Sequence, residues 1–585
     1  MLRTKIVCTI GPASRSPEML RELVRSGMNV ARLNFSHGDL NVHAENVARI
    51  HRASEELDRP VAILMDLQGP KLRVGEMEGN GVVLSQGEQV TLTTRPILGH
   101  SGEIPVQYQS LPQLAERGDR ILMDDGLLEV IVLGVDATEI HTKVVTGGLL
   151  TSNKGMNLPH AHSSISAITE KDRSDLEFAV AHQADWIALS FVRTAKEVLD
   201  LRTLIAGESS LGRPIPVIAK IEKPEAVENI DAIIEAANGI MVARGDLGIE
   251  SAPEGVPLIQ KMIIKKCNDA GVPVITATQM LDSMIRNPRP TRAEASDVAN
   301  AILDGTDALM LSGETAAGEY PLQSLQTMVR IAQRTEADIF HMHSSLPVRP
   351  PQTRDIAEAV SHSACETARH LDATAIITPT ASGHTARMVA KYRPPMPIIA
   401  VTPSPGTRRR ICLLWGVHPL LAKRTDNTDE LLADAVAAAR CHGYVQPGDL
   451  VVITAGAAGS APLSTNLIRV HVVERILCRG TGVGSRCVQG EARVLGTPLL
   501  DPSEIRGSDI LVICRTTPEI VALAEKAAGL VTAEGDASSH AAQLATELGI
   551  PAVVGVGESA KALKDRQTIT LDPGKGLVYE GSVRA

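Results

Sequence analysis

A lysine and two carboxylates end neighbouring apolar segments near the middle of the chain. Lys220 and Glu222 close the segment IPVIAKIE, and Asp246 follows the segment GIMVAR. On a strand, residues two apart project to the same side, so Lys220 and Glu222 share a face. Carboxylates from adjacent strand ends suit a hard divalent cation, Mg²⁺ or Mn²⁺, and a nearby lysine suits an anion that the cation holds. The pattern predicts metal-assisted chemistry on an acidic small molecule, and a structural Lys220–Glu222 ion pair is the alternative.

Polar side chains also end four further apolar segments. In VARLNFSHG, three of them (Arg32, Asn34 and Ser36) alternate with apolar residues and fall on one face of a strand. A cation, an amide and a hydroxyl aimed at one point suit a phosphate and its counter-cation, although a solvated strand edge has the same pattern. The other segments contribute Asp66 with Lys71 and Arg73, Thr276 with Thr278, and Ser312 with Glu314. Six polar strand ends together favour a site at the carboxyl edge of a parallel sheet.

Apolar runs and helical patterns alternate along the first half of the chain. The runs predict eight strands: Lys5–Ile10, Val30–Ser36, Val61–Leu67, Trp186–Val192, Val217–Glu222, Ile240–Arg244, Val274–Gln279 and Ala308–Glu314. The patterns between them predict helices, among them Ser16–Ser26, Asn41–Leu57, Pro224–Ala237 and Val256–Ala270. Eight such β–α units with right-handed crossovers favour a (β/α)8 TIM barrel, a parallel α/β fold. An open doubly wound sheet is the alternative.

Changes in composition along the sequence predict four domains in this chain. Residues 71–167 carry short alternating stretches broken by Gly and Asp, which predict an inserted all-β lid domain. The barrel then comprises residues 1–70 and 168–344. The polar, proline-rich segment HSSLPVRPPQTRD predicts a linker, and residues 345–473 predict a further α/β domain. Residues 474–585 are rich in Gly and small residues and predict a separate compact appendage.

Composition excludes several classes of protein. Aromatic residues make up only 2% of the 585 residues and the net charge is -10, which argues against a nucleic-acid partner. No apolar run approaches the roughly 20 residues of a membrane helix, and the first residues predict a strand rather than a leader peptide. The eight cysteines show no CxxC pairing or metal-ligand spacing. A cytoplasmic protein in a reducing environment is therefore expected.

The motifs at these strand ends resemble those of the pyruvate kinase family over about residues 1–473. They are ARLNFSHG, MDLQGPKLR, MDDGL, IAKIEKPE, ARGDLG, TATQMLDSM and MLSGETA. The resemblance implies phosphoryl transfer from phosphoenolpyruvate to ADP, giving pyruvate and ATP, with Mg²⁺ or Mn²⁺ as cofactor. It also implies a homotetramer that a phosphorylated small molecule regulates. Phosphoryl transfer needs positioning and charge neutralisation rather than a covalent nucleophile, which agrees with the polar strand ends.

The resemblance further implies roles for individual residues. Glu222 and Asp246 would bind the metal, and Lys220 would neutralise charge on the phosphoryl group and the developing enolate. Arg32 would hold the phosphoryl group. The substrate carboxylate would lie at a helix N-terminus. Its expected binding residues are Gly245, Asp246 and Thr278.

Proton transfer and nucleotide binding involve further positions in the family. Thr278 and Ser312 would form the water-linked relay that protonates the enolate. Other residues match the family's nucleotide and monovalent-cation region: Asn34, Ser36, His37, Arg73 and Lys171.

One departure from the family concerns K⁺. Many members carry Asp-Thr-Lys-Gly-Pro-Glu after the third strand, where this chain has Asp66, Leu67, Gln68, Gly69, Pro70 and Lys71. The Lys71 ammonium could take the place of a hydrated monovalent cation, as in the K⁺-independent branch of the family. We therefore predict activity without K⁺. The alternative is that Lys71 faces solvent and K⁺ binds through Asn34, Ser36 and Asp66.

The third domain contains a Gly/Ser/Thr-rich turn, TPTASGHTARMV, between a predicted strand and a helix. Hydroxyls and backbone N–H groups at a helix N-terminus can bind an anion, and the family binds phosphorylated effectors here. A sugar phosphate or nucleotide monophosphate is the expected ligand. A plain helix cap would use the same residues. The candidate effector residues are Thr380, Ser382, Gly383, His384 and Thr385.

The last stretch resembles the phosphohistidine domain of phosphoenolpyruvate-utilising enzymes, with His540 at the position of the phosphorylated histidine. It has Gly535-Asp536 where that family has Gly-Gly, and no ATP-grasp partner is recognisable. A structural or regulatory appendage is therefore favoured over a working phosphocarrier. Two other functions stay open: a phosphohistidine-dependent dikinase, and a catalytically inactive metabolite sensor.

Overall fold

The computed structural model describes residues 1–158, 166–208, 214–343, 355–456, 465–474, 476–495 and 502–581. Its chain divides into two compact units, Met1–His442 with Val452–Arg469, and Gly443–Val451 with Val470–Ala585. Nearly all of the predicted proline-rich linker lies outside the described residues. No helix among the described residues is long and apolar enough to cross a membrane.

Eight parallel strands close into a barrel in the order β1-β17-β16-β15-β14-β13-β3-β2. They are β1 (Lys5–Thr9), β2 (Val30–Asn34), β3 (Ala62–Asp66), β13 (Trp186–Leu189), β14 (Val217–Ile221), β15 (Gly239–Ala243), β16 (Val274–Ala277) and β17 (Ala308–Leu311). These strands are buried on both faces, which explains their continuous apolar runs. The prediction of a closed barrel is confirmed, and the open sheet is excluded.

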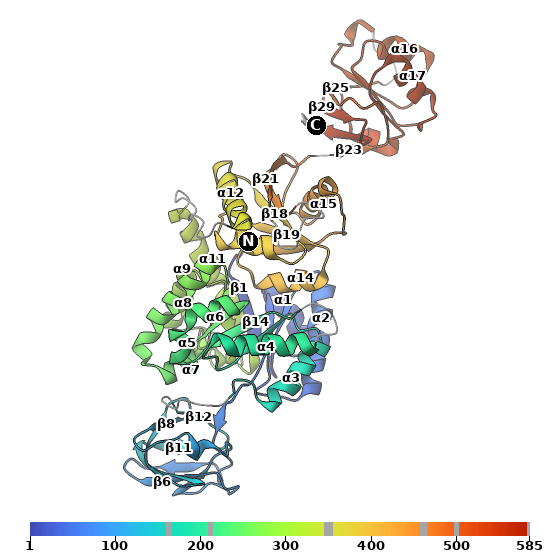
Figure 1. The fold of residues 1–585 in the computed structure, drawn as a ribbon. Coiled ribbons are helices and arrows are strands. Elements are labelled where there is room, and N and C mark those ends of the chain that lie inside the picture. Colours follow the sequence, from blue (N-terminus) through green and yellow to red (C-terminus); the bar gives the residue numbers. More distant parts are fainter. Residues whose placement is uncertain are drawn as a thin grey trace. The chain divides into compact units, whose positions relative to one another are not determined.

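Helices cover the outside of the barrel, as Figure 1 shows for α4, α8 and α11. They include α1 (Pro17–Ser26), α2 (Leu40–Glu56), α3 (Glu170–Ala181), α4 (Ala195–Glu208), α8 (Val256–Ala270), α9 (Arg292–Asp304) and α11 (Pro321–His343). Polar side chains start several of them. Thr169 and Thr291 each form a capping box with the acidic residue three positions on.

The predicted helix Pro224–Ala237 is wrong in one respect, because it is broken. The structure has α5 (Pro224–Glu228) and α6 (Ile230–Ala236), with Asn229 between them in a non-helical conformation. The Asn229 amide donates to the Arg193 and Glu225 carbonyl oxygens. An asparagine that bonds backbone groups in this way competes with the helix.

The inserted domain is all-β, as predicted. Its main sheet has the order β4-β12-β8-β9-β10-β6-β7, and a second sheet pairs β11 with β5. The strands are β4 (Leu72–Arg73), β5 (Val82–Leu84), β6 (Gln89–Thr93), β7 (Glu103–Pro105), β8 (Arg120–Met123), β9 (Leu128–Val135), β10 (Glu139–Thr146), β11 (Gly148–Leu150) and β12 (Gly155–Asn157). Buried aliphatic side chains from both sheets form its own core.

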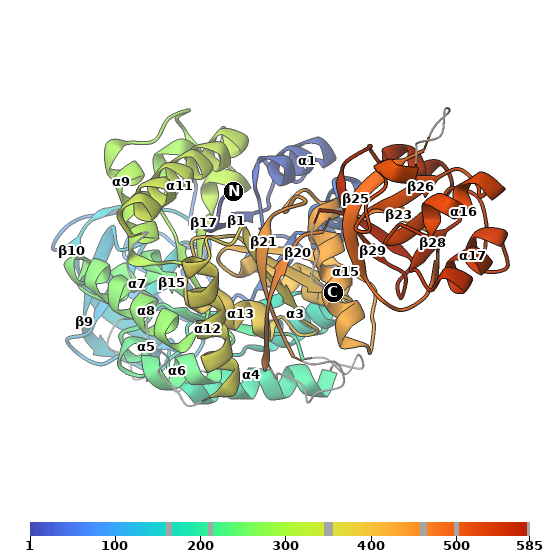
Figure 2. The same cartoon turned by 90° about the horizontal axis from the view of Figure 1, so that it is seen from above.

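The third domain is a five-stranded sheet in the order β20-β19-β18-β21-β22. Its strands are β18 (Ala375–Pro379), β19 (Ile398–Thr402), β20 (Val417–Leu421), β21 (Leu450–Ala455) and β22 (Leu467–Val472). Figure 2 shows α12 (Ile356–His370) and α13 (His384–Lys391) on one side of this sheet and α15 (Thr428–Cys441) on the other. Short α14 (Pro405–Arg410) leads into the turn at Ile411–Leu413.

The second unit contains an eight-stranded sheet in the order β23-β30-β29-β25-β26-β27-β28-β24. The strands are β23 (Ile476–Arg479), β24 (Thr481–Val483), β25 (Val488–Val494), β26 (Ile510–Ile513), β27 (Gly529–Thr532), β28 (Ala552–Val554), β29 (Thr568–Asp572) and β30 (Leu577–Glu580). Side chains of helices α16 (Pro518–Ala524) and α17 (His540–Leu548) belong to a buried hydrophobic cluster of this unit.

Candidate active site

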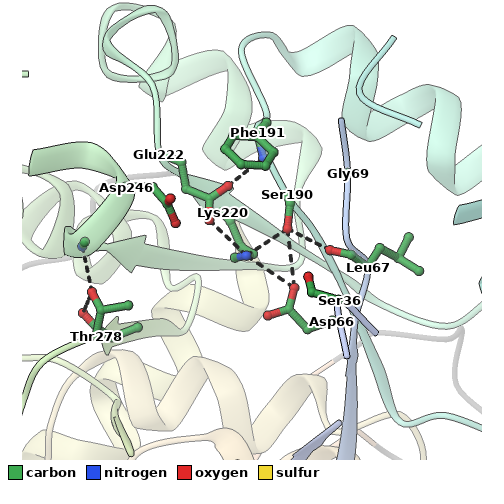
Figure 3. A network of polar contacts seen from close by, with 12 residues as sticks. Ser36, Asp66, Leu67, Gly69, Ser190, Phe191, Lys220, Glu222, Asp246 and Thr278 are labelled. Carbon is green, nitrogen blue, oxygen red and sulfur yellow. Dashed lines mark hydrogen bonds and ion pairs between the residues drawn. The ribbon is translucent and has the colours of Figure 1, made fainter. Parts of the chain in front are cut away.

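Lys220 lies at the centre of a buried polar network at the carboxyl end of the barrel (Figure 3). Its ammonium contacts the Glu222 carboxylate at 2.9 Å and the Asp66 carboxylate at 3.4 Å. It also donates to the Ser190 hydroxyl at 2.7 Å, and that hydroxyl donates to the Leu67 carbonyl oxygen. Only 11% of the Lys220 side chain is exposed. A lysine so fixed presents its charge in one place without further reorganisation.

Asp66 is the shared counter-ion of two cations. The Arg32 guanidinium donates to Asp66 through Nε at 2.7 Å and to the Thr9 hydroxyl at 3.0 Å. Burial alone would raise the pKa of Asp66, but Lys220 and Arg32 outweigh it and hold that pKa below its usual value. The Asp66 and Glu222 carboxylates raise the pKa of Lys220 and outweigh the opposing effect of burial. Asp66 and Lys220 are therefore both charged at neutral pH.

Glu222 and Asp246 supply oxygen donors on the other side of Lys220. Glu222 accepts a hydrogen bond from the Phe191 N–H at 2.7 Å, and burial and the Asp246 charge raise its pKa, while Lys220 opposes the shift. Asp246 lies near the start of α7 (Arg244–Glu250), turned toward Glu222 in Figure 3. It forms an ion pair with Lys71 at 3.8 Å. Two facing carboxylates with an all-oxygen donor set fit a hard divalent cation.

Thr278 ties the end of β16 to the start of α7. Its hydroxyl accepts from the Gly245 N–H at 2.8 Å and donates to the Ala277 carbonyl oxygen at 2.6 Å. Thr278 has φ +66°, and Phe191 and Gln279 each have φ +53°. Residues other than glycine adopt this left-handed conformation at a cost in free energy, and such strained residues are common at functional sites.

Ser312 and Glu314 have different surroundings although both follow β17. The Ser312 hydroxyl is buried and has no hydrogen-bond partner among the described residues. Glu314 belongs to α10 (Gly313–Ala316) rather than to the strand, so the predicted strand Ala308–Glu314 is too long. Its carboxylate accepts from the Leu281 and Ser312 N–H groups and fixes the loop between them.

The residues expected at the nucleotide and monovalent-cation region lie along the β2 and β3 ends. Asn34 accepts from the Ser36 N–H at 3.1 Å. Burial lowers the pKa of His37, and three cations nearby, Arg73, Lys71 and Arg32, lower it further. Its imidazole is therefore neutral at physiological pH.

Two further residues of this region form hydrogen bonds with other parts of the protein. Lys171 donates to the Phe35 carbonyl oxygen at 2.8 Å and to Asp175 at 2.6 Å. Arg73 donates to the Asn153 carbonyl oxygen within the inserted domain. Lys71 borders an open cavity of about 1040 Å³ that Gly245, Asp246 and Thr278 also line.

Two site residues have no counterpart in the sequence-based prediction. Ser190 holds Lys220 in place, and the polar residue directly after the apolar run WIAL was the available signal. Arg244 donates to the Thr278 carbonyl oxygen and to Asp297, each at 2.8 Å, and lines the cavity. Arg244 lies within ARGDLG, but nothing in the sequence indicates that its side chain turns toward α9.

The hydrogen bonds of the third-domain turn are those of a helix start. Thr380 accepts from the Gly383 N–H at 2.9 Å, and Ser382 accepts weakly from the His384 N–H at 3.4 Å. Gly383 has φ +89° and precedes α13, and the Thr385 hydroxyl contacts the Thr465 hydroxyl at 2.9 Å. The Ser382 side chain is exposed.

His540 is the first residue of α17 and is exposed. Its Nδ1 lies 2.8 Å from the Thr516 hydroxyl. The Asp536 carboxylate accepts from the N–H and the hydroxyl of Ser538, which shapes the turn before the helix. The imidazole is thus oriented on one side by Thr516.

Comparison with known proteins assigns three parts of the chain to family models. Residues 1–325 match pyruvate kinase, barrel domain. Residues 358–471 match pyruvate kinase, alpha/beta domain, and residues 505–576 match PEP-utilising enzyme, mobile domain.

Individual relatives match over nearly the whole length. A pyruvate kinase from Geobacillus stearothermophilus is 49% identical over 581 residues, 99% of each chain. One from Bacillus licheniformis is 47% identical over 584 residues, again 99% of each chain. A crystal structure of a pyruvate kinase from Cryptosporidium parvum matches with a TM-score of 0.74 and 39% identity, over 81% of this chain and 96% of that one.

Proposed function

This chain belongs to the pyruvate kinase family and is an enzyme, and we propose that its barrel site transfers the phosphoryl group of phosphoenolpyruvate to ADP with Mg²⁺ as cofactor. The observation that carries the proposal is the buried ammonium of Lys220 between Glu222 and Asp66, with Arg32 on the far side of Asp66. This arrangement places fixed positive charge beside Glu222, which forms the candidate metal site with Asp246. Phosphoryl transfer requires that combination.

In the proposed reaction, the bond between phosphorus and the enol oxygen of phosphoenolpyruvate breaks, and a bond to a terminal ADP oxygen forms. Arg32 holds the phosphoryl oxygens, and Lys220 stabilises the negative charge that develops on the enolate. Glu222 and Asp246 would hold a divalent cation, which would supply further positive charge at this point. The substrate carboxylate lies at the start of α7, beside Gly245 and Thr278.

The enolate must then gain a proton on its methylene carbon to become pyruvate. We assign this transfer to the Thr278 and Ser312 hydroxyls through water. Support comes from the Ser312 hydroxyl, which is buried and makes no hydrogen bond to the described residues. Asn34, His37, Arg73 and Lys171 are proposed to contact the nucleotide.

The test of the reaction is the initial rate of pyruvate formation from phosphoenolpyruvate and ADP, with and without Mg²⁺. The proposal expects a rate that depends on all three and a matching yield of ATP. Pyruvate formation that requires AMP with phosphate or pyrophosphate in place of ADP would instead support the dikinase alternative. Absence of turnover with every metal would support the sensor alternative.

We also propose that the enzyme works without K⁺. The Lys71 ammonium lies 3.8 Å from Asp246, so it can supply a positive charge at the rim of the site. Rates in K⁺ and in tetramethylammonium buffers should agree within about twofold. Dependence of the parent enzyme on K⁺ would contradict the proposal and would favour K⁺ binding through Asn34, Ser36, Asp66 and Leu67.

Regulation by a phosphorylated effector is proposed at Thr380, Ser382, Gly383, His384 and Thr385. The exposed Ser382 hydroxyl and the start of α13 support an anion site there. Thermal-shift titration with sugar phosphates and nucleotide monophosphates should find a stabilising ligand whose effect Ser382→Ala removes. A response that is equal in Ser382→Ala would leave only a helix cap.

The remaining proposals concern assembly and location. A homotetramer of the family type is proposed, and analytical ultracentrifugation tests it. A location in the reducing cytoplasm is also proposed, and the eight free cysteines support it. The last domain is proposed as a structural or regulatory appendage rather than as a phosphocarrier through His540.

A further inference from the structure

One buried carboxylate outside the catalytic network joins the lid domain to the barrel. Glu250 is the last residue of α7, and its side chain is 0% exposed. Its Oε1 accepts from the Lys223 ammonium at 2.6 Å and from the Asn157 side-chain amide at 2.7 Å. Its Oε2 is buried and has no hydrogen-bond partner among the described residues.

Glu250 and its two partners come from three segments around the site. Lys223 directly follows Glu222, a proposed metal ligand, in the chain. Asn157 ends β12, the last strand of the lid domain. Glu250 itself lies four residues after Asp246 on the same short helix. A single carboxylate therefore contacts the lid and the segment that carries Glu222, and it lies on the helix that carries Asp246.

This arrangement carries a free-energy cost. A buried carboxylate is expensive unless its oxygens are bonded, and here both donors share one oxygen. A cavity of about 50 Å³ lies against the contact, lined by Leu72, Met156, Phe191 and others. The side chains thus have room to shift.

We propose that Glu250 is a positioning residue that couples the lid to the metal site. When Asn157 donates to Glu250, the carboxylate holds Lys223 and the end of α7 in place. Glu222 and Asp246 are then fixed at the separation that a divalent cation requires. When the lid amide withdraws, this constraint relaxes. The inference rests on the proposed function, because it assumes that Glu222 and Asp246 bind the metal.

The test uses Asn157→Ala in the full-length protein, with Gln107→Ala as the matched control. Gln107 is a lid residue whose amide bonds to Asn153 within the same domain. We expect Asn157→Ala to lower kcat by about tenfold, as loss of a hydrogen bond to a charged group can. Mn²⁺ affinity with phosphoenolpyruvate present, measured by electron paramagnetic resonance, should weaken several-fold, although Asn157 is not a ligand. Gln107→Ala should change neither quantity.

A double-mutant cycle separates the contact from general damage to the fold. Glu250→Gln weakens the Lys223 contact and should reduce Mn²⁺ affinity by itself. Adding Asn157→Ala to Glu250→Gln should then have less effect than it has in the parent. Additive effects, or an Asn157→Ala variant that matches Gln107→Ala in kcat and in Mn²⁺ affinity, would overturn the proposal. Asn157→Ser serves the same comparison if Asn157→Ala does not fold.

Failure of the proposed function is recognised separately. A parent protein that forms no pyruvate, or that does not bind Mn²⁺, would contradict the assignment of the site itself. A fully active parent with normal Asn157 and Glu250 variants would contradict only the coupling.

Discussion

The two ends of the barrel bury charged groups in opposite ways. At the carboxyl end, the pKa of Asp66 is lowered and that of Lys220 is raised, so burial is outweighed and both groups remain charged. At the amino end, burial lowers the pKa of Lys5 to about 8 and raises that of Asp185 to about 6. There the charged forms are disfavoured.

The difference follows from the partners. Asp66 lies between two cations, whereas Lys5 donates to the Val417 carbonyl oxygen at 2.6 Å. Asp185 accepts hydrogen bonds from the Arg409 guanidinium at 3.0 Å. A group that must act on a substrate needs its charge maintained by several neighbours. A group at a domain contact needs only hydrogen-bond partners.

The amino end is also closed by another domain. Cys412 and Leu413, from the turn after α14, join the aliphatic cluster inside the barrel. Trp186 donates its indole N–H to the Arg410 carbonyl oxygen at 3.1 Å. This end therefore holds the barrel and the third domain together, and the carboxyl end carries the chemistry.

The largest expected effect is on catalysis at the carboxyl end. Lys220→Met removes the charge that stabilises the enolate and should reduce kcat by at least about a thousandfold. Lys196→Met changes an exposed lysine and should leave kcat unchanged. Steady-state rates of both variants, with circular dichroism to verify folding, make the comparison. An active Lys220→Met enzyme would remove the proposed mechanism.

A core change at the amino end should affect stability and spare catalysis. Leu413 is 1% exposed, so Leu413→Ala should reduce the free energy of unfolding by about 2–5 kcal/mol. Leu371→Ala, at an exposed leucine of the same domain, should cost well under about 1 kcal/mol. Chemical denaturation measures both. Loss of kcat in folded Leu413→Ala would show that the two ends are not separable.

A smaller effect is expected in the pH dependence of stability. Burial raises the folded-state pKa of Asp185 to about 6, above its usual value of 3.8. Its contribution to stability is therefore complete below about pH 4 and is lost as the pH rises to about 6. Relative to Asp185→Asn, the parent should lose about 2–3 kcal/mol over this range. A constant difference would contradict the raised pKa, and Asp434→Asn, at an exposed site, should track the parent.

Much of the carboxyl end could be predicted from sequence. Arg32, Asp66, Lys220 and Glu222 each interrupt an apolar run, and strand periodicity then fixes the face on which they lie. The closed barrel followed from eight repeats of one pattern. The break at Asn229 was missed because it depends on bonds to backbone carbonyl groups from two segments.

The amino end could not be predicted in the same way. Asp185 and Arg409 are separated by 224 residues, and their contact exists only after two domains have docked. Local patterns carry no record of such a contact. Glu250 is similar, since its link to Asn157 spans 93 residues and requires the lid domain to be folded.

The most direct measurement is kcat/KM for phosphoenolpyruvate in Asp66→Asn, with thermal unfolding recorded in parallel. The amide keeps the shape of Asp66 but removes the charge that Lys220 and Arg32 share. Displaced cations should lower kcat/KM by about a hundredfold or more, in a protein still folded at the assay temperature. A value within about twofold of the parent would contradict the claim that this charge network carries the reaction.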